Sequence, residues 1–262
     1  MTPPRFAFLG TSAALASAQR DNTSLVIEGG GAVVLLDCGG AAMHRLQRLG
    51  LDPHALSHVV ITHVHVDHAY GLPSLVRQLM IAGRAAPLTV VCRPEHVEPL
   101  EALLRLFNVW GRPGEFPLQL LPIAPAVGAA AFTTGDLVVT TAPNAHGAMP
   151  NFAVRLDAPG VRALVYSSDT LPSEAVVTLA RGAGTLAHDA SYSERDRTGH
   201  VGTAHSTAAE AAEVAARAGV GRLLLTHVGA EYHDDVDVLA AEARARFGGM
   251  VEVAEEMRLY GF

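Results

Sequence analysis

The feature that most constrains this chain is a group of four potential metal ligands within six positions. Residues 63–68 read His-Val-His-Val-Asp-His and directly follow residues 58–62, a short segment with the pattern of a buried strand. Alternation along an extended chain places His63 and His65 on one side. A turn at Asp67 and His68 then offers the next pair at a neighbouring point. Two ligand pairs predict two metal ions, and they disfavour the alternative of a histidine-rich solvated loop.

The kind of metal follows from the available ligand atoms. The chain has only two cysteines, Cys38 and Cys92, and both lie in apolar stretches, so a thiolate zinc site is excluded. Imidazole and carboxylate ligands suit zinc, manganese or iron. We therefore expect two divalent metal ions as cofactors, with zinc the first candidate and manganese or iron the others.

Three more candidate ligands each stand in a polar segment at the end of an apolar run. They are His146, Asp169 and His227. The ends of strands are where α/β folds place their chemistry, and a carboxylate such as Asp169 can bridge two metals. Taken singly, each residue is as well explained by a capping or core role. Beside the first cluster, a ligand role is the better explanation.

The order of predicted elements indicates the fold class. Expected strands cover residues 6–9, 23–28, 32–37, 58–62, 88–92, 136–141, 152–156, 163–167, 185–188, 222–226 and 251–260. Expected helices cover residues 41–49, 73–82, 95–107, 173–181, 206–218 and 236–247, and the four prolines of residues 111–128 predict an irregular connection. This order predicts an α/β chain forming a single domain over residues 1–262, with two mixed β-sheets packed together and helices on the outer faces as a four-layer αββα sandwich. A doubly wound parallel sheet is the competing hypothesis, which the glycine-rich hairpin at residues 29–31 disfavours.

Composition and charge narrow the partners. Hydrophobic residues make up 49% and charged residues 17%, which favours a sizeable core over disorder. No apolar run reaches the ~18 residues that span a bilayer, and the N-terminus lacks a signal-peptide pattern, so we expect a cytoplasmic protein without a membrane partner. The net charge is −7 and all nineteen basic residues are arginines. The sequence has no basic run or stripe, so its charge does not predict a long nucleic acid as partner.

Several stretches together resemble the metallo-β-lactamase superfamily of hydrolases, and within it the ribonuclease Z-like branch. The most specific is residues 62–73, Thr-His-Val-His-Val-Asp-His-Ala-Tyr-Gly-Leu-Pro. The other matching stretches are residues 8–12, 22–25, 36–39, 166–170 and 225–227, so the resemblance runs nearly end to end. It implies the αββα fold, in agreement with the order of elements above.

The resemblance also implies a ligand assignment. One metal would be bound by His63, His65 and His146, the second by Asp67, His68 and His227, with Asp169 and a water or hydroxide bridging them. Asp67 is then expected to serve catalysis as well as metal binding. Asp37 is expected to orient the loop of residues 63–68 from behind.

Two further stretches resemble motifs of the ribonuclease Z-like branch. Residues 188–191 read His-Asp-Ala-Ser, and residues 204–212 begin Ala-His-Ser-Thr. The resemblance makes His205 a catalytic, proton-handling residue that Asp189 orients. The alternative for His205 is a structural position at a helix N-terminus, beside the capping residues Ser206 and Thr207.

These residues favour a phosphodiesterase, in which a metal-bridging hydroxide attacks and His205 with Asp189 assists the leaving group. The alternatives are tRNA 3′-end processing, acyl, lactone or sulfate-ester hydrolysis, and a non-catalytic metal-binding module. Ribonuclease Z enzymes commonly carry a long tRNA-gripping arm, but residues 83–145 show no clear arm and the chain has no lysine. We therefore expect a small phosphodiester or ester substrate ahead of tRNA. A homodimer is implied only by the habit of the family.

Overall fold

The computed structural model describes residues 3–128, 130–200 and 202–262, and its strands form two seven-stranded sheets. The first sheet has the order β14-β1-β2-β3-β4-β5-β6, and the second has the order β13-β12-β11-β10-β9-β8-β7. Their bounds in the first sheet are β1 (Arg5–Gly10), β2 (Ser24–Gly29), β3 (Ala32–Leu36), β4 (Leu56–Val60), β5 (Leu88–Cys92), β6 (Leu118–Pro122) and β14 (Leu259–Gly261). In the second they are β7 (Ala130–Thr134), β8 (Leu137–Pro143), β9 (Phe152–Asp157), β10 (Leu164–Tyr166), β11 (Thr185–Asp189), β12 (Arg222–Thr226) and β13 (Met250–Val253).

Both sheets are mixed. The pairs from β14 to β3 are antiparallel and those from β3 to β6 are parallel. The second sheet repeats this arrangement, antiparallel from β7 to β10 and parallel from β10 to β13. The predicted hairpin is formed by β2 and β3, and its turn residues Gly30 and Gly31 have φ values of 59° and 79°, which only glycine adopts readily. The doubly wound parallel sheet is therefore excluded.

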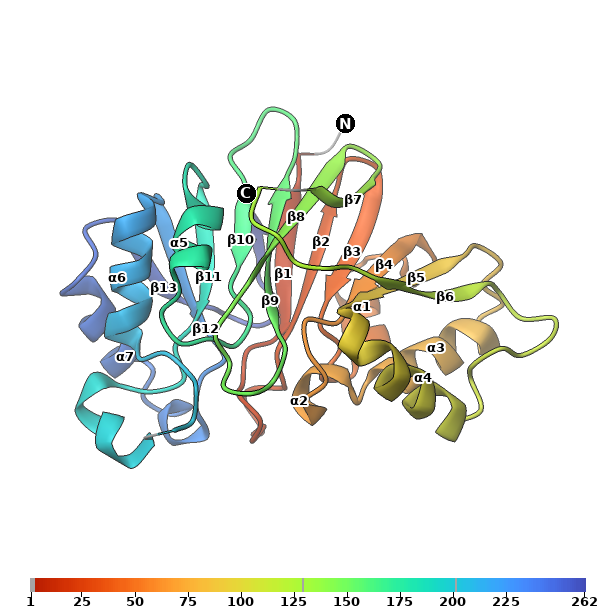
Figure 1. Cartoon of the computed structure of the whole chain (residues 1–262), viewed down its shortest axis with the longest axis horizontal. Coiled ribbons are helices and arrows are strands. Elements are labelled where there is room, and N and C mark those ends of the chain that lie inside the picture. The colour runs from red at the N-terminus through yellow and green to blue at the C-terminus, as the bar shows by residue number, and fades with distance from the viewer. Residues whose placement is uncertain (1–2, 129, 201) are drawn as a thin grey trace.

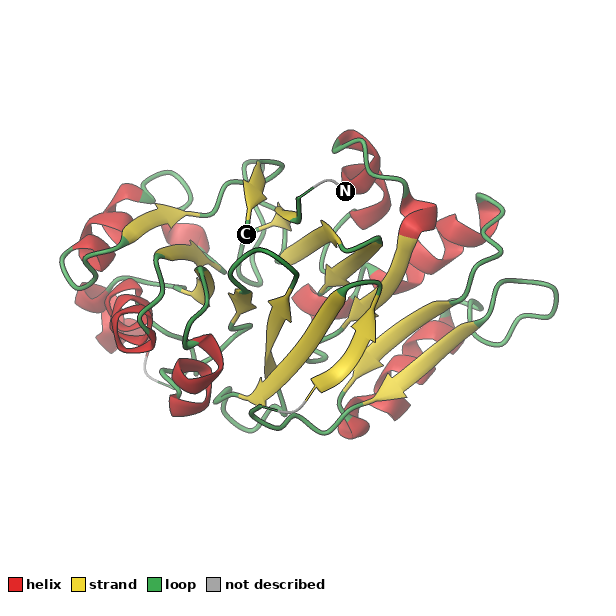
Figure 2. Cartoon of the chain, turned by 90° about the horizontal axis from the view of Figure 1, so that it is seen from above, coloured by secondary structure: helices red, strands yellow, loops and turns green. Residues whose placement is uncertain are grey.

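Helices cover the outer face of each sheet, on opposite sides of the molecule (Figures 1 and 2). They are α1 (Ala42–Arg48), α2 (Val66–Ala69), α3 (Leu72–Ile81), α4 (Val97–Leu106), α5 (Glu174–Ala180), α6 (Ala208–Ala218) and α7 (Asp237–Arg244). Short 3₁₀ helices are η1 (Pro53–Ala55), η2 (Pro94–His96), η3 (Glu194–His200) and η4 (Ala230–Tyr232). No helix in the described part of the chain has the length and hydropathy needed to cross a membrane.

Strand β1 shows how the layers are built from side-chain alternation. Phe6 and Phe8 enter the apolar core shared by the two sheets, whereas Ala7 and Leu9 face the core between the first sheet and its helices. A third core lies between the second sheet and α5, α6 and α7. Three apolar cores between four layers confirm the predicted αββα sandwich.

The predicted list of strands is wrong in three places. Residues 111–128 are not wholly irregular, because they contain β6, which pairs with β5 at the sheet edge. Strand β7 occupies the edge of the other sheet, where no element is predicted. Residues 251–260 do not form one strand, since β13 extends the second sheet and β14 pairs with β1 in the first.

Candidate active site

The candidate site lies where loops follow the carboxyl ends of strands from both sheets. His63, His65, Asp67 and His68 belong to the segment that leaves β4 and enters α2. The other three predicted ligands follow strands of the second sheet, namely His146 after β8, Asp169 after β10 and His227 after β12. The structure thus brings all seven predicted ligands to one place, across the junction of the two halves of the sandwich.

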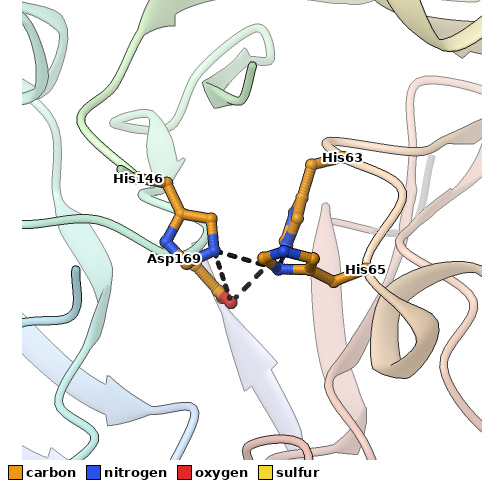
Figure 3. A group of neighbouring side chains, drawn as sticks. All are labelled: His63, His65, His146 and Asp169. Carbon is orange, nitrogen blue, oxygen red and sulfur yellow. Dashed lines mark hydrogen bonds and ion pairs between the residues drawn. The ribbon is translucent and has the colours of Figure 1, made fainter. Parts of the chain in front are cut away.

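The first group consists of His63, His65, His146 and Asp169, whose potential ligand atoms all lie within 4.8 Å of one another. Nδ1 of His65 is 3.0 Å from Nε2 of His63 and 3.0 Å from Nε2 of His146. Figure 3 shows the two histidines of the motif approaching from one side, and His146 and Asp169 from the other. Burial lowers the pKa of both His63 and His146, which favours the neutral imidazole that binds metal.

The second group consists of Asp67, His68, Asp169 and His227, and all four are buried. Oδ2 of Asp169 lies 3.2 Å from Nε2 of His68 and 3.1 Å from Nε2 of His227. Oδ2 of Asp67 lies 3.5 Å and 3.4 Å from the same two nitrogens. Asp169 belongs to both groups, as a bridging carboxylate would.

Hydrogen bonds behind the histidines fix which nitrogen faces the site. Nδ1–H of His68 donates to Oδ2 of Asp37 at 2.8 Å, and Nδ1–H of His146 donates to the carbonyl of Ala204 at 3.1 Å. His227 donates from Nδ1 to Oγ of Ser191 at 3.0 Å, because the Ser191 hydroxyl itself donates to Asp189 at 2.7 Å. In a neutral ring each Nε2 then carries a lone pair directed into the site.

These lone pairs test whether the residues fit a metal. Nε2 of His68 and Oδ1 of Asp169 are buried and have no hydrogen-bond partner among the described residues. Burial opposes protonation of His68, yet the carboxylates of Asp169 and Asp37 outweigh it and raise the pKa of His68 well above its ordinary value. The raised pKa means that the carboxylates favour a positive charge at His68, and a divalent metal bound among these donors would supply one. The nitrogen and oxygen donors of both groups thus fit divalent metals.

Asp37 supports the ligand loop from behind. Its carboxylate is fully buried and accepts hydrogen bonds from the backbone N–H of Thr62 at 2.8 Å, the hydroxyl of Tyr166 at 3.0 Å, and His68. It therefore ties the start of the loop to its last ligand. Asp37 and His227 both have positive φ values, 57° and 56°, a backbone conformation that is uncommon outside glycine and that clusters at functional sites.

The partly exposed His205 and the buried Asp189 form a third feature beside the ligands. Nδ1–H of His205 donates to Oδ2 of Asp189 at 2.9 Å, and the ring stacks on that of His227 with centroids 4.9 Å apart. Burial opposes protonation of His205, but the Asp189 carboxylate raises its pKa. The capping box of α6 is made by Thr207 and Glu210, so His205 stands just before the helix, as the structural alternative expects, while its own side chain is bonded to Asp189.

A cavity of about 510 Å³ opens onto both ligand groups and onto His205. Its outer wall comprises residues that the sequence did not indicate: Ala13, Ala14, Leu15, Val66, Tyr192, His200, Thr203, Gly229, Ala230 and Glu231. Val66 is 69% exposed in the structure. Its place between the ligands of the motif is a local sequence signal that could have indicated this part of the cavity wall. The remaining wall residues come from loops that only the fold brings together.

Sheets, helices and a double His/Asp cluster at the strand ends define a hydrolase of the metallo-β-lactamase fold. Solved structures show the same architecture: the metallo-β-lactamase fold protein YhfI from Bacillus subtilis has a TM-score of 0.83 at 21% identity, covering 100% of both chains. The short form of human tRNase Z has a TM-score of 0.79 at 22% identity, covering 98% of each chain.

Sequence comparison places the chain more narrowly. The ribonuclease Z of Haloarcula marismortui is 30% identical, over 96% of this chain and 94% of that protein, and the ribonuclease Z of Salinibacter ruber is 32% identical, over 96% and 92%. Residues 4–237 match the family model described as anti-Pycsar protein Apyc1. The chain therefore belongs to the ribonuclease Z-like branch of the metallo-β-lactamase superfamily and to the Apyc1 family within that fold.

Proposed function

We propose that this protein is a dinuclear metal-dependent hydrolase of phosphodiester bonds. The observation that carries the proposal is the His205–Asp189 hydrogen bond of 2.9 Å beside the two ligand groups, with His205 lining the cavity that both groups reach. A two-metal site alone would serve acyl, lactone or sulfate esters equally well. A histidine held by a buried carboxylate adds the proton donor that an alkoxide leaving group needs.

Two sets of residues would hold the metals. The first is His63, His65, His146 and Asp169; the second is Asp67, His68, His227 and Asp169. When bound, divalent metals lower the pKa of a water and neutralise charge on phosphate oxygens. The complete donor set disfavours a non-catalytic metal-binding module.

His205 would act on the leaving group. Because its Nδ1–H is engaged by Asp189, its Nε2 is the nitrogen available to the cavity. The raised pKa of His205 favours the imidazolium form, which donates a proton from Nε2 to the departing alkoxide. Asp189 is fully buried and accepts further hydrogen bonds from the backbone N–H of Thr170 and from Ser191, which hold it in place.

Precursor tRNA is the first candidate substrate. The relatives that match over nearly the whole chain carry the name ribonuclease Z, and this supports RNA processing more directly than it supports a small phosphodiester. Cleavage at the 3′ end of a precursor tRNA uses the same phosphodiester chemistry. The expected preference for a small substrate is thus the less supported of the two.

A small phosphodiester is the second candidate, and the chain's own residues favour it. The match to the Haloarcula protein spans 299 aligned positions, more than the 262 residues here, so that relative contains segments this chain lacks. The described part of residues 83–145 holds two strand pairs, β5 with β6 and β7 with β8, together with η2, α4 and loops, without an added arm-like element. Phosphate contacts dominate RNA affinity, and the described residues that line the cavity include no arginine.

The test is turnover by metal-quantified protein with zinc and with manganese. Bis(p-nitrophenyl) phosphate should be hydrolysed with at least one metal, and absence of turnover with both would refute the proposal. Precursor tRNA, a cyclic nucleotide and a p-nitrophenyl acyl ester tested in parallel separate the candidates. Acyl hydrolysis that survives His205→Ala, with no phosphodiester turnover, would favour the acyl alternative.

A further inference from the structure

A second cavity stands beside the metal-binding loop, where α2, α3 and the end of α4 meet. It has a volume of about 400 Å³, and its lining includes Tyr70 and Phe107. These two are the most exposed aromatic side chains in the described part of the chain, with exposed fractions of 47% and 59%. Exposed apolar surface rimmed by polar residues marks a binding site more often than chance, so two exposed rings in one cavity indicate a ligand.

Helix α2 joins this aromatic cavity to the metal-site cavity. Val66 is the first residue of α2 and lines the metal-site cavity, whereas Tyr70 ends the same helix and lines the aromatic cavity. The backbone N–H of Tyr70 donates to the carbonyl of Val66 at 3.0 Å. Residues four apart on a helix share one face, with Cβ atoms about 5–6 Å apart. The two cavities are therefore neighbours along one side of α2.

The aromatic cavity has an apolar floor and a polar rim. Pro73 and Val109 line it and are buried. Ser74, Arg77 and Gln78 recur at helical spacing on the exposed side of α3, and the Gln78 amide donates to the Ser74 hydroxyl at 3.1 Å. The rim thus carries both hydrogen-bonding groups and one positive charge.

That positive charge is free to meet a ligand. Arg77 is exposed, and among the described residues none forms a hydrogen bond or an ion pair with its guanidinium. The described lining of the aromatic cavity also holds no carboxylate, although the chain as a whole has a net charge of −7. An anionic group would therefore meet an arginine here and no opposing charge.

These features together match a nucleotide. A base stacks on an exposed aromatic ring whatever its sequence, and an arginine binds phosphate with a planar fork of donors. The alternative occupant is a second copy of this chain, since α3 and α4 also expose Ile81 and Leu106. The free guanidinium and the position beside the metal-site cavity favour the nucleotide, because an apolar contact between two chains would use neither.

We infer that the aromatic cavity is a subsite for a single-stranded nucleotide that lies next to the scissile phosphodiester, with its base stacked on Phe107 and its phosphate bound by Arg77. The inference rests on the proposed phosphodiester chemistry and extends it toward a polynucleotide substrate. The subsite supplies the arginine that the described lining of the metal-site cavity does not offer.

The test compares a short oligonucleotide with a longer one. Binding of the dinucleotide TpT and of hexathymidylate to the zinc-loaded protein is measured by calorimetry, with chromatography showing that both ligands stay intact. Hexathymidylate should bind the wild type about tenfold more tightly than TpT, because one further base stacks. Phe107→Ala should remove this advantage without changing the affinity for TpT, and Phe107→Trp should restore it.

The charge of the subsite has its own measurement. Arg77→Gln should weaken hexathymidylate binding and make it less dependent on salt, because one phosphate contact is lost. Arg48→Gln, which removes an exposed arginine of α1 outside the aromatic cavity, is the matched control and should leave the salt dependence unchanged.

The matched control for the ring is Leu106→Ala. Leu106 precedes Phe107, is 77% exposed and lies outside the aromatic cavity, so its loss should leave the affinity ratio unchanged. A ratio that stays the same in Phe107→Ala would overturn the inference, while hydrolysis of bis(p-nitrophenyl) phosphate would keep the phosphodiesterase proposal intact. A smaller assembly of Phe107→Ala in light scattering would also overturn it, by assigning this face to a contact between copies. If neither ligand binds and no phosphodiester is hydrolysed, the proposed function itself fails.

Discussion

Oδ2 of Asp37 lies 2.8 Å from Nδ1 of His68, and both side chains are fully buried. The pair joins the end of β3 to the last ligand of the motif, 31 residues later. Because Asp37 accepts the Nδ1 proton, the Nε2 lone pair of His68 faces Asp169 and the second ligand group. A residue that touches no metal therefore sets the direction of a ligand.

Asp37→Asn should weaken metal binding without removing a ligand. An amide can present its NH₂ to Nδ1 and favour the wrong tautomer, so we expect zinc affinity to fall about 10–100-fold. Competition with a chromophoric chelator measures this affinity. Asp136→Asn, an exposed residue in the turn before β8, is the control. Equal affinities for both variants would show that Asp37 does not orient His68.

His205→Ala should lower kcat for a phosphodiester about 10²–10⁴-fold, because the leaving group loses its proton donor. Metal content should stay at the wild-type level, since the seven ligands remain. Steady-state kinetics on a 3′,5′-cyclic nucleotide, whose leaving group is an alkoxide that needs a proton, provides the measurement, with metal quantified in each sample. Replacing the exposed His44 of α1 by alanine controls for the loss of an imidazole. A fall in kcat matched by a fall in metal content would instead assign His205 to metal binding.

The sequence predicts the ligand groups and the layers because both depend on local patterns. The motif at residues 63–68 places four candidate ligands by itself, and His146, Asp169 and His227 each follow a strand of the second sheet. The continuous apolar run of residues 6–9 likewise suits a strand that is buried on both faces, as β1 is. Each of these features depends on residues that are neighbours in the sequence, so it can be predicted without knowledge of distant contacts.

What the sequence misses depends on long-range pairing. β6 is an edge strand that ends at Pro122 and is largely exposed, so its pattern lacks the apolar continuity of β5. The split between β13 and β14 follows from pairing with β12 and with β1, more than 200 residues away in the second case. Glu231 and His200 stand 31 positions apart, and only the approach of η3 and η4 pairs them.

Metal removal should destabilise the fold measurably. Without cations, Nε2 of His68 and Oδ1 of Asp169 are buried without hydrogen-bond partners among the described residues. A ligand at about 1,000 times its Kd stabilises the folded state by ~4 kcal/mol, so chelation should lower Tm by several degrees and zinc should restore it. Scanning calorimetry before and after dialysis against a chelator tests this. An unchanged Tm would argue that these residues hold no metal in solution.

The acid side of the stability curve should depend on His188, a fully buried residue of β11 outside the ligand groups. Burial lowers the pKa of His188, and the carbonyl of Asp189, which accepts its Nδ1–H at 2.8 Å, offsets this only in part. Its Nε2 has no partner among the described residues. The folded state therefore resists a proton that the unfolded chain accepts near pH ~6.5. Because the folded pKa is the lower one, the stabilisation is present above pH ~6.5 and is lost as the pH falls toward the folded pKa.

The variant His188→Gln removes this ionisation. The free energy of unfolding of the variant should therefore fall less steeply than that of the wild type between pH ~7.5 and ~5. Urea unfolding of both proteins in the same chelator measures the two slopes, and the other titrating groups cancel in the comparison. Parallel curves would mean that His188 is not protonated on unfolding in this range.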